Sequence, residues 1–533
     1  MEKLFLRQLA GLAILAALVS TSVLPVEAAP NNSRPAAGVR APTSGFQRPG
    51  QRRDLTDAAS GTVTINASSP GATISRNVRG ANEAMWFDIT QSGLVQEFET
   101  AGLASTRWPG GSGSDKYHWA TNSACYPEHN YVNPNSTFDN FMNDFAIPAG
   151  LSPWVTLNYG TNATCTAGGD PSEAAAWVKY ANITKHYGVK YWTVGNESFA
   201  PWETDLHSIQ HDPTTYANAV AGSGGYYSQI KAVDPTAQVG VVVAGTGGPC
   251  YYFPGWDPTV LKHAKYDFVE FHCYPQGRGN ESDQYLVQQA ATDVANSVAS
   301  LRKEMTSYNV PASVPIFVGE LGSVSTAPGK QSTSITQALY AGQLIANLMT
   351  IGVQRATWWD GNPGCEQDGN FSSSLYGWQN FGGFMIFSDG IPEYGPPGKC
   401  NTNVPTIPRG TLLPTASVYK VLANFGSDGG TMLASAVSQS LPLVRAYGAT
   451  RSGGYSVLLF NLDQANAANV TVTIAHATGS SYNVQETVYD KSLYDASKNN
   501  VWSAPVTTTS KAISPTFSLT LSPWSVTVVN LTS

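Results

Sequence analysis

Short apolar runs alternate with longer amphipathic stretches over most of the chain. The stretches 171–188, 282–308 and 334–352 have the periodicity of helices. The apolar runs are NVRGANEAMWF, LASTRWPGG, SPWVTLNYG, VKYWTVGNE, QVGVVVAG, DFVEFHCYP, VPIFVGELG and VQRATWWDG. Eight strand-like runs separated by helices predict an α/β fold, a (β/α)8 TIM barrel. The alternative is an open doubly wound sheet, which usually has a glycine-rich phosphate turn after its first strand, and GANEAMW is not such a turn.

The pattern changes after Gly426, where helical periodicity stops. Short strands follow with turn residues between them: LPLVRAYGA, GYSVLLFNL, NVTVTIAHA, YNVQETVYD, TFSLTLSP and WSVTVVNLTS. Such spacing is typical of an antiparallel β-sandwich, predicted here for residues 427–533. Residues 77–426 are then the barrel, and the β-prone segment 55–76 is expected to add its strand to the sandwich.

The first 28 residues have the composition of a secretory signal peptide. Lys3 and Arg7 precede an apolar core, and Val26-Glu27-Ala28 offers a small-residue cleavage site. The alternative is a membrane anchor, but the core is short of the roughly 20 apolar residues that a spanning helix needs. Residues 29–54 are rich in Pro, Ser, Gly and Arg and predict a disordered linker. We therefore expect a secreted protein, extracellular or periplasmic, that is free of the membrane after cleavage.

Six cysteines are an even set that suits an exported protein. Six cysteines allow 15 connectivities, so the sequence leaves the pairing open, and buried free thiols are the alternative. Pairing in chain order would join Cys125 to Cys165, Cys250 to Cys273 and Cys365 to Cys400.

Composition and motifs exclude several classes of function. Charged residues are only 13% of the chain, the net charge is −7 and there is no basic run, which argues against a nucleic-acid partner. The 13 Trp and 25 Tyr suit a neutral ligand covered with hydroxyl groups. No HExxH, P-loop or GxSxG motif occurs, which argues against a zinc protease, a nucleotide hydrolase and a common serine esterase. We expect no cofactor and no metal.

Two glutamates stand at the ends of predicted barrel strands, where barrel enzymes carry their chemistry. Glu197 ends the fourth run and Glu320 ends the seventh. Either residue alone is explained as well by a salt bridge or a loop cap. Two glutamates at matching strand ends, each flanked by aromatic residues, indicate a facing pair of carboxyl groups that cleaves acetals. In a retaining enzyme the two carboxyl groups are about 5–5.5 Å apart.

The motifs RWPGG, YWTVGNE, DFVEFHCYP and the Trp pair after the eighth run resemble those of the retaining glycoside hydrolases of clan A. They look most like the α-L-arabinofuranosidases of glycoside hydrolase family 51. In that family the nucleophile usually lies in an Asp-Glu-Trp context, whereas this chain has Gly319-Glu320-Leu321. Families 39 and 79 share the architecture.

The resemblance implies a role for each candidate residue. Glu197 would be the general acid/base and Glu320 the nucleophile. The residues expected to bind substrate are Asn196 (sugar 2-hydroxyl), Arg107 and Tyr274 (donors to Glu320), His272, Trp359 (a platform under the ring) and Glu83 (a sugar hydroxyl). His272 is explained nearly as well by a hydrogen-bonded structural role.

The resulting hypothesis is a secreted retaining glycosidase, most like an α-L-arabinofuranosidase, acting on a plant-type poly- or oligosaccharide. An endo-β-glycanase with the same carboxyl pair is one alternative. A β-glucuronidase-like enzyme is another, for which Lys116 and Arg278 are candidate partners of a substrate carboxylate. A non-catalytic carbohydrate-binding protein is the third. The sequence does not indicate an oligomeric state.

Overall fold

The computed structural model describes residues 58–126, 130–361, 368–377, 381–388, 390, 407–499 and 501–533. The predicted signal peptide, the linker and the Cys365–Cys400 pair lie outside the described residues. Among the described residues, no helix combines the length and the apolar character that a membrane crossing requires.

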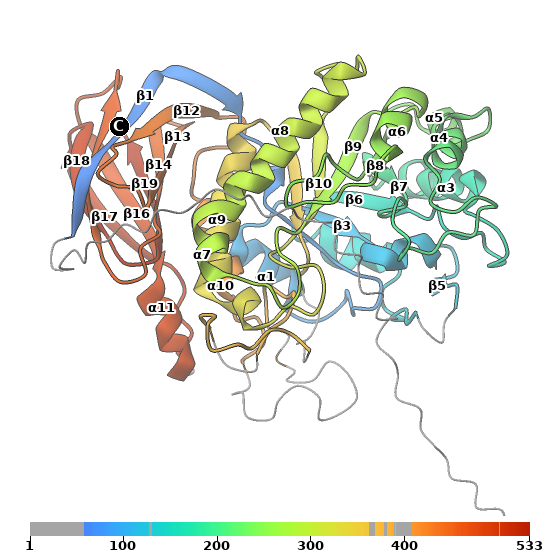
Figure 1. The fold of residues 1–533 in the computed structure, drawn as a ribbon, viewed down its shortest axis with the longest axis horizontal. Coiled ribbons are helices and arrows are strands. Elements are labelled where there is room, and N and C mark those ends of the chain that lie inside the picture. The colour runs from blue at the N-terminus through green and yellow to red at the C-terminus, as the bar shows by residue number, and fades with distance from the viewer. Residues whose placement is uncertain are drawn as a thin grey trace, which may run out of the picture. The chain divides into compact units, whose positions relative to one another are not determined.

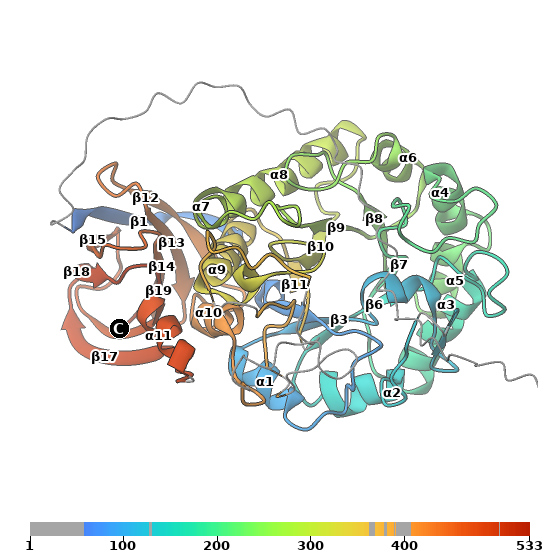
Figure 2. The same cartoon turned by 60° about the horizontal axis from the view of Figure 1, so that its bottom comes forward.

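Eight parallel strands close into a barrel, as the alternating pattern predicts (Figure 2). Around the ring the order is β10-β11-β2-β3-β6-β7-β8-β9. The strands are β2 (Gly80–Asn82), β3 (Ser105–Trp108), β6 (Ser152–Leu157), β7 (Tyr191–Val194), β8 (Gln238–Val243), β9 (Phe268–Cys273), β10 (Ile316–Leu321) and β11 (Arg355–Trp358). The first predicted run is a strand over only three residues, because the chain turns away after Asn82.

Helices surround this ring (Figure 2). They are α1 (Leu94–Ala101), α2 (Phe138–Asn140), α3 (Pro171–Val178), α4 (Pro213–Ala221), α5 (Tyr226–Val233), α6 (Trp256–His263), α7 (Asp283–Tyr285), α8 (Ala291–Ser307), α9 (Ile335–Thr350) and α10 (Pro414–Leu422). Asp170 caps α3, because its carboxylate accepts a hydrogen bond from the Ser172 backbone N–H and Pro171 occupies the first turn. The helix predicted over 282–308 is confirmed from Asp283 to Ser307, with a π-helical segment (Leu286–Ala290) between α7 and α8.

The barrel interior is layered along its strands. Side chains alternate between the two faces of a strand, so Phe268, Glu270 and His272 share the inward face of β9. Phe268 packs against Trp154 and Phe317 in a small apolar cluster. Glu270 lies above this cluster, and His272 follows at the carboxyl end of the strand. A polar layer therefore lies between the apolar cluster and the barrel mouth.

The C-terminal strands form one curled nine-stranded sheet, in the order β17-β16-β19-β14-β13-β12-β1-β15-β18. Its members are β1 (Ala59–Thr73), β12 (Thr431–Val437), β13 (Val444–Arg451), β14 (Gly454–Asn461), β15 (Ala468–Ala475), β16 (Tyr482–Asp490), β17 (Val506–Ile513), β18 (Thr516–Leu521) and β19 (Ser525–Thr532), with helix α11 (Lys491–Ala496) after β16. The blue strand β1 lies among the orange and red strands, antiparallel to β12 and parallel to β15 (Figure 1). Apolar residues from both ends of the sheet share one core, which gives the predicted sandwich.

The sheet also packs on the outer helices of the barrel. Phe460 and Val528 of the sheet belong to the same buried cluster as Val418 of α10. Tyr447 donates a hydrogen bond of 2.8 Å to Asn347 of α9. These contacts favour a supporting role for the sheet.

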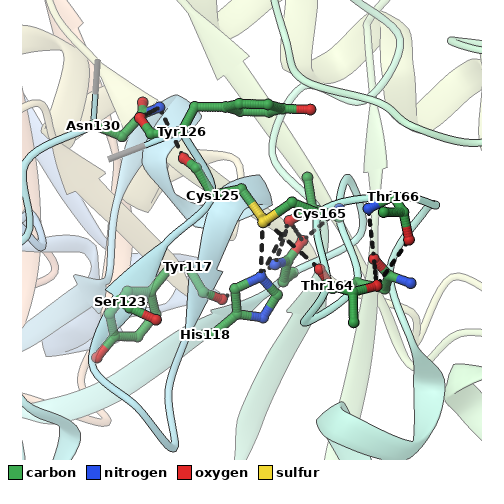
Figure 3. The surroundings of a disulfide bond; sticks show 12 residues. Tyr117, His118, Ser123, Cys125, Tyr126, Asn130, Thr164, Cys165 and Thr166 are labelled. Atoms are coloured by element: carbon green, nitrogen blue, oxygen red, sulfur yellow. Dashed lines mark hydrogen bonds between the residues drawn. A yellow bond between two sulfur atoms is a disulfide. The ribbon is translucent and has the colours of Figure 1, made fainter. Parts of the chain in front are cut away.

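Two disulfides lie in the described residues, and both follow chain order. Cys125 pairs with Cys165, and the His118 ring lies beside their bond, with Nε2 3.3 Å from Cys125 Sγ (Figure 3). Cys250 pairs with Cys273, the last residue of β9. The second bond ties the loop after β8 to the strand that carries His272.

Removing the second disulfide is expected to weaken the fold. It spans 23 residues, for which loop-closure entropy predicts a loss of about 3 kcal/mol in the free energy of unfolding. Chemical denaturation of the Cys250→Ala, Cys273→Ala double variant measures this loss. The Cys125→Ala, Cys165→Ala variant, which opens a span of 40 residues, should lose a similar amount. An unchanged midpoint in both would show that the bonds contribute nothing to stability.

Candidate active site

Six of the eight predicted site residues meet at the carboxyl end of the barrel. Glu197 follows β7 and Glu320 lies near the end of β10, and both are buried. One carboxylate oxygen of Glu197, one of Glu320 and one ring nitrogen of His272 all lie within 4.8 Å of one another. Arg107, Asn196 and Tyr274 complete the group through hydrogen bonds. This upper limit lies below the roughly 6.5–9.5 Å of an inverting pair and is closer to the about 5–5.5 Å of a retaining one.

The turn after β7 holds Glu197 in an uncommon backbone conformation. Its φ is +42°, a left-handed value that usually costs a non-glycine residue about 1–3 kcal/mol. Asp115 fixes the turn, because its carboxyl group accepts a hydrogen bond of 3.0 Å from the backbone N–H of Asn196. Burial raises the pKa of Asp115 to about 7. The Glu197 side chain is fixed separately, because Trp202 Nε1 donates to its Oε2 at 2.8 Å.

A bulge in β10 directs Glu320 into the barrel. Phe317 pairs with Glu270 of β9, but the register shifts at Gly319, so Glu320 comes to lie opposite His272. The Glu320 carboxylate then accepts Tyr274 OH at 2.7 Å and pairs with Arg107 Nη1 at 3.2 Å.

Arg107 and Asn196 orient each other. Arg107 Nη2 donates to Asn196 Oδ1 at 2.7 Å, which fixes the amide so that its nitrogen is the donor. That nitrogen gives one hydrogen bond of 3.0 Å to the buried Glu203. An amide nitrogen has two N–H groups, so the second N–H has the chemistry to donate to a sugar hydroxyl.

The two catalytic candidates share one charged environment. Burial raises the pKa of Glu320 and the Glu197 charge adds to the rise, although His272, Arg107 and Tyr274 oppose it. Burial also opposes the charge of His272, but Glu320 and hydrogen bonds to Glu197 and Glu270 raise the pKa of His272 to about 10. These partners favour the cationic form of His272 at neutral pH.

The other two predicted residues are placed differently. Trp359 follows β11 and its ring lies against Gly111, with Trp86 edge-on at 6.1 Å, so it belongs to the loops at the mouth. Glu83 directly follows β2, whose last residue, Asn82, donates a hydrogen bond of 2.9 Å to Gly319 O. Burial and the nearby Asp360 raise the pKa of Glu83 well above its ordinary value.

Four further residues of the site were not found from the sequence: Asp115, Trp202, Glu203 and Glu270. Glu270 had a readable signal, since it interrupts the apolar run DFVEF two positions before His272. Asp115 lies in a short 3-10 helix (Gly111–Lys116) and Trp202 and Glu203 lie in the loop after β7, and no periodicity in the sequence points to them. Asp115 and Glu203 hold Asn196, and Trp202 holds Glu197.

Comparison with known proteins gives the same class of enzyme. No family model matches the chain. It is 26% identical over 197 residues to a probable α-L-arabinofuranosidase C of Aspergillus clavatus, covering 32% of this chain and 34% of that protein. It is 27% identical over 238 residues to an intracellular exo-α-(1→5)-L-arabinofuranosidase of Bifidobacterium longum, covering 40% and 38%. The matched region is thus about a third of the length of these relatives.

The fold comparison extends over more of the chain. The GH51 α-L-arabinofuranosidase of Thermotoga petrophila superposes with a TM-score of 0.63 at 16% identity, covering 88% of this chain and 99% of that one. The predicted likeness to glycoside hydrolase family 51 is confirmed. The relatives are glycoside hydrolases, in agreement with the predicted enzyme class, and the barrel with its C-terminal sheet is the fold they share with this chain.

Proposed function

We propose that the chain is a retaining glycosidase that removes α-L-arabinofuranosyl groups from plant-type poly- or oligosaccharides. The observation that carries the proposal is the buried pair Glu197 and Glu320 at the ends of β7 and β10, with oxygens within 4.8 Å. The names of the sequence relatives support the sugar, and the N-terminal sequence supports export.

The first step is attack by Glu320 on the anomeric carbon. Arg107 and Tyr274 donate to its carboxylate, which favours the ionised form. The resemblance to family 51 assigns the proton of the pair to Glu197 as the general acid. As the bond between the sugar and the leaving oxygen breaks, Glu197 gives this proton to the leaving oxygen.

The second step reverses these roles. Water attacks the anomeric carbon of the glycosyl-enzyme, Glu197 takes the proton of the water, and the bond to Glu320 breaks. Asn196 donates to the 2-hydroxyl, a type of contact that strengthens at the transition state. Trp359 provides an apolar surface at the mouth for the face of the ring.

Hydrolysis of a substrate panel tests the proposal. Wild-type protein is offered nitrophenyl glycosides of arabinofuranose, xylose, glucose and glucuronic acid, and the polymers arabinan, xylan and β-glucan. We expect arabinose from the arabinofuranoside and from arabinan. Oligosaccharides alone would instead indicate an endo-glycanase, and release from the glucuronide a glucuronidase. Binding without hydrolysis of any substrate would contradict a catalytic role.

A further inference from the structure

Glu270 lies beneath the catalytic pair and has no part in the two-step reaction described above. Its side chain is fully buried on the inward face of β9. Its Oε1 lies 2.8 Å from Arg107 Nε and 2.9 Å from His272 Nε2. A buried carboxylate is costly unless it is paired, and both of these partners are groups of the proposed site.

The backbone around Glu270 leaves space for this contact. A Cβ added at Gly319 would collide with Glu270 Oε1 and would lie 2.7 Å from His272 Nε2. Only glycine at position 319 lets β10 pass so close to the two side chains. The bulge that turns Glu320 inward therefore also accommodates the Glu270–His272 contact.

Both ring nitrogens of His272 face carboxylate oxygens. Nε2 faces Glu270, while Nδ1 is 3.0 Å from Glu197 Oε1 and 3.7 Å from Glu320 Oε2. A neutral imidazole has one N–H and meets both contacts only if Glu197 donates its own proton to Nδ1, whereas an imidazolium donates to both carboxylates. The geometry thus fits the cation. Burial alone would raise the pKa of Glu270, but Arg107 and then His272 outweigh it and hold that pKa below its ordinary value.

The charges of the buried groups balance at one protonation state. The cations facing the pair are Arg107 from β3 and His272 from β9, the carboxyl groups are Glu197, Glu270 and Glu320, and Tyr274 is a neutral donor. Glu203, Asp115 and Lys116 form a neighbouring group; burial raises the pKa of Glu203 and Asp115, lowers that of Lys116, and so favours the neutral form of all three. Two cations offset two carboxylates, so the third carboxyl group must carry a proton for the set to be neutral. An uncompensated charge at this depth would be strongly unfavourable.

We propose that Glu270 is a positioning residue that keeps His272 an imidazolium and thereby makes the Glu197/Glu320 pair hold one proton. The second half of this statement rests on the proposed function. In the glycosyl-enzyme Glu320 is an uncharged ester and Glu197 has given up its proton. The two cations, Arg107 and His272, then again face two carboxylates, Glu197 and Glu270. His272 then keeps its proton through the whole cycle.

The first test is an NMR titration of the histidine rings in the full chain, which needs no substrate. The chain has eight histidines, and the His272 signals are assigned by their loss in His272→Gln. From about pH 5 to about pH 8, either side of the ordinary histidine value, wild-type His272 should keep both ring nitrogens protonated. In Glu270→Gln the pKa of His272 should fall from about 10 by about 1–3, the shift that a partner carboxylate causes, so a titration extended to about pH 9 should show the loss of a proton.

A matched control separates this effect from a general loss of charge. Glu173 contacts His118 Nδ1 at 3.0 Å, a similar carboxylate–histidine pair outside the site. Glu173→Gln should leave the His272 titration unchanged. A wild-type His272 that titrates near the ordinary value would overturn the proposal even if Glu270→Gln fails to fold. An unchanged His272 titration in a folded Glu270→Gln would overturn it as well.

The second test follows kcat/KM with pH on the substrate identified by the panel. As long as His272 is still protonated, removing the negative charge of Glu270 leaves excess positive charge beside the pair, so the pair should lose its proton at lower pH. The alkaline limb should move toward acid by about 1 pH unit, a tenfold loss of rate on that limb. Glu270→Asp, which keeps the charge, should restore much of the profile. An unmoved limb would overturn the catalytic half, whereas a wild type inactive on every substrate would refute the proposed function and leave the titration result standing.

Discussion

Glu320→Ala is expected to lower kcat by about 10⁴-fold or more, because no other group in the site can form the covalent intermediate. Azide should restore turnover by entering the space left by the side chain. It attacks from the face that Glu320 occupied, so the glycosyl azide should have the inverted anomeric configuration. Nitrophenol release and NMR of the azide product measure the two effects.

The matched control for this variant is Glu320→Gln. It should be equally inactive and should not respond to azide, since the amide fills the space that azide needs. Azide rescue of both variants, or more than about a tenth of wild-type activity in either, would remove Glu320 from the role of nucleophile.

Glu197→Ala should show a loss that depends on the leaving group. General acid catalysis contributes about 10²–10⁴-fold, and it matters most where the leaving oxygen is strongly basic. Hydrolysis of arabinan should therefore fall far more than cleavage of a dinitrophenyl glycoside. For the activated substrate the second step becomes limiting, because no base activates water, and the glycosyl-enzyme should accumulate as a burst of dinitrophenol.

Azide distinguishes Glu197 from Glu320. In Glu197→Ala it attacks the glycosyl-enzyme from the face opposite Glu320, so the product should retain the configuration of the substrate. Glu173→Ala, which removes a carboxylate outside the site, should keep wild-type kinetics. An equal loss of rate on all leaving groups would contradict the acid/base role of Glu197.

The sequence was informative where a periodic pattern determines the outcome. Eight apolar runs predicted the barrel, and the ends of the fourth and seventh runs located Glu197 and Glu320. The direction of the Glu83 side chain does not follow from the pattern, because β2 ends at Asn82, one residue before it. Asp360 and Glu97 lie near enough for their charges to raise the pKa of Glu83, and its role as a sugar ligand stays a prediction.

What could not be predicted depends on contacts between distant segments. The bulge at Gly319 depends on how β10 pairs with β9, and a single run of letters does not contain that register. The function of Glu270 emerges only when Arg107, 163 positions earlier in the chain, is placed beside it. Asp115 comes from a short 3-10 helix and Trp202 and Glu203 from the loop after β7, segments whose course is set by tertiary packing.

The most direct test of a double displacement across Glu197 and Glu320 is the configuration of the sugar when it is first released. Wild-type protein in high concentration hydrolyses a nitrophenyl arabinofuranoside in an NMR tube, and the anomeric proton is followed before the sugar mutarotates. A double displacement predicts that the α-anomer appears first and that the β-anomer grows in later. Initial appearance of the β-anomer would mean a single displacement by water and would contradict Glu320 as the nucleophile.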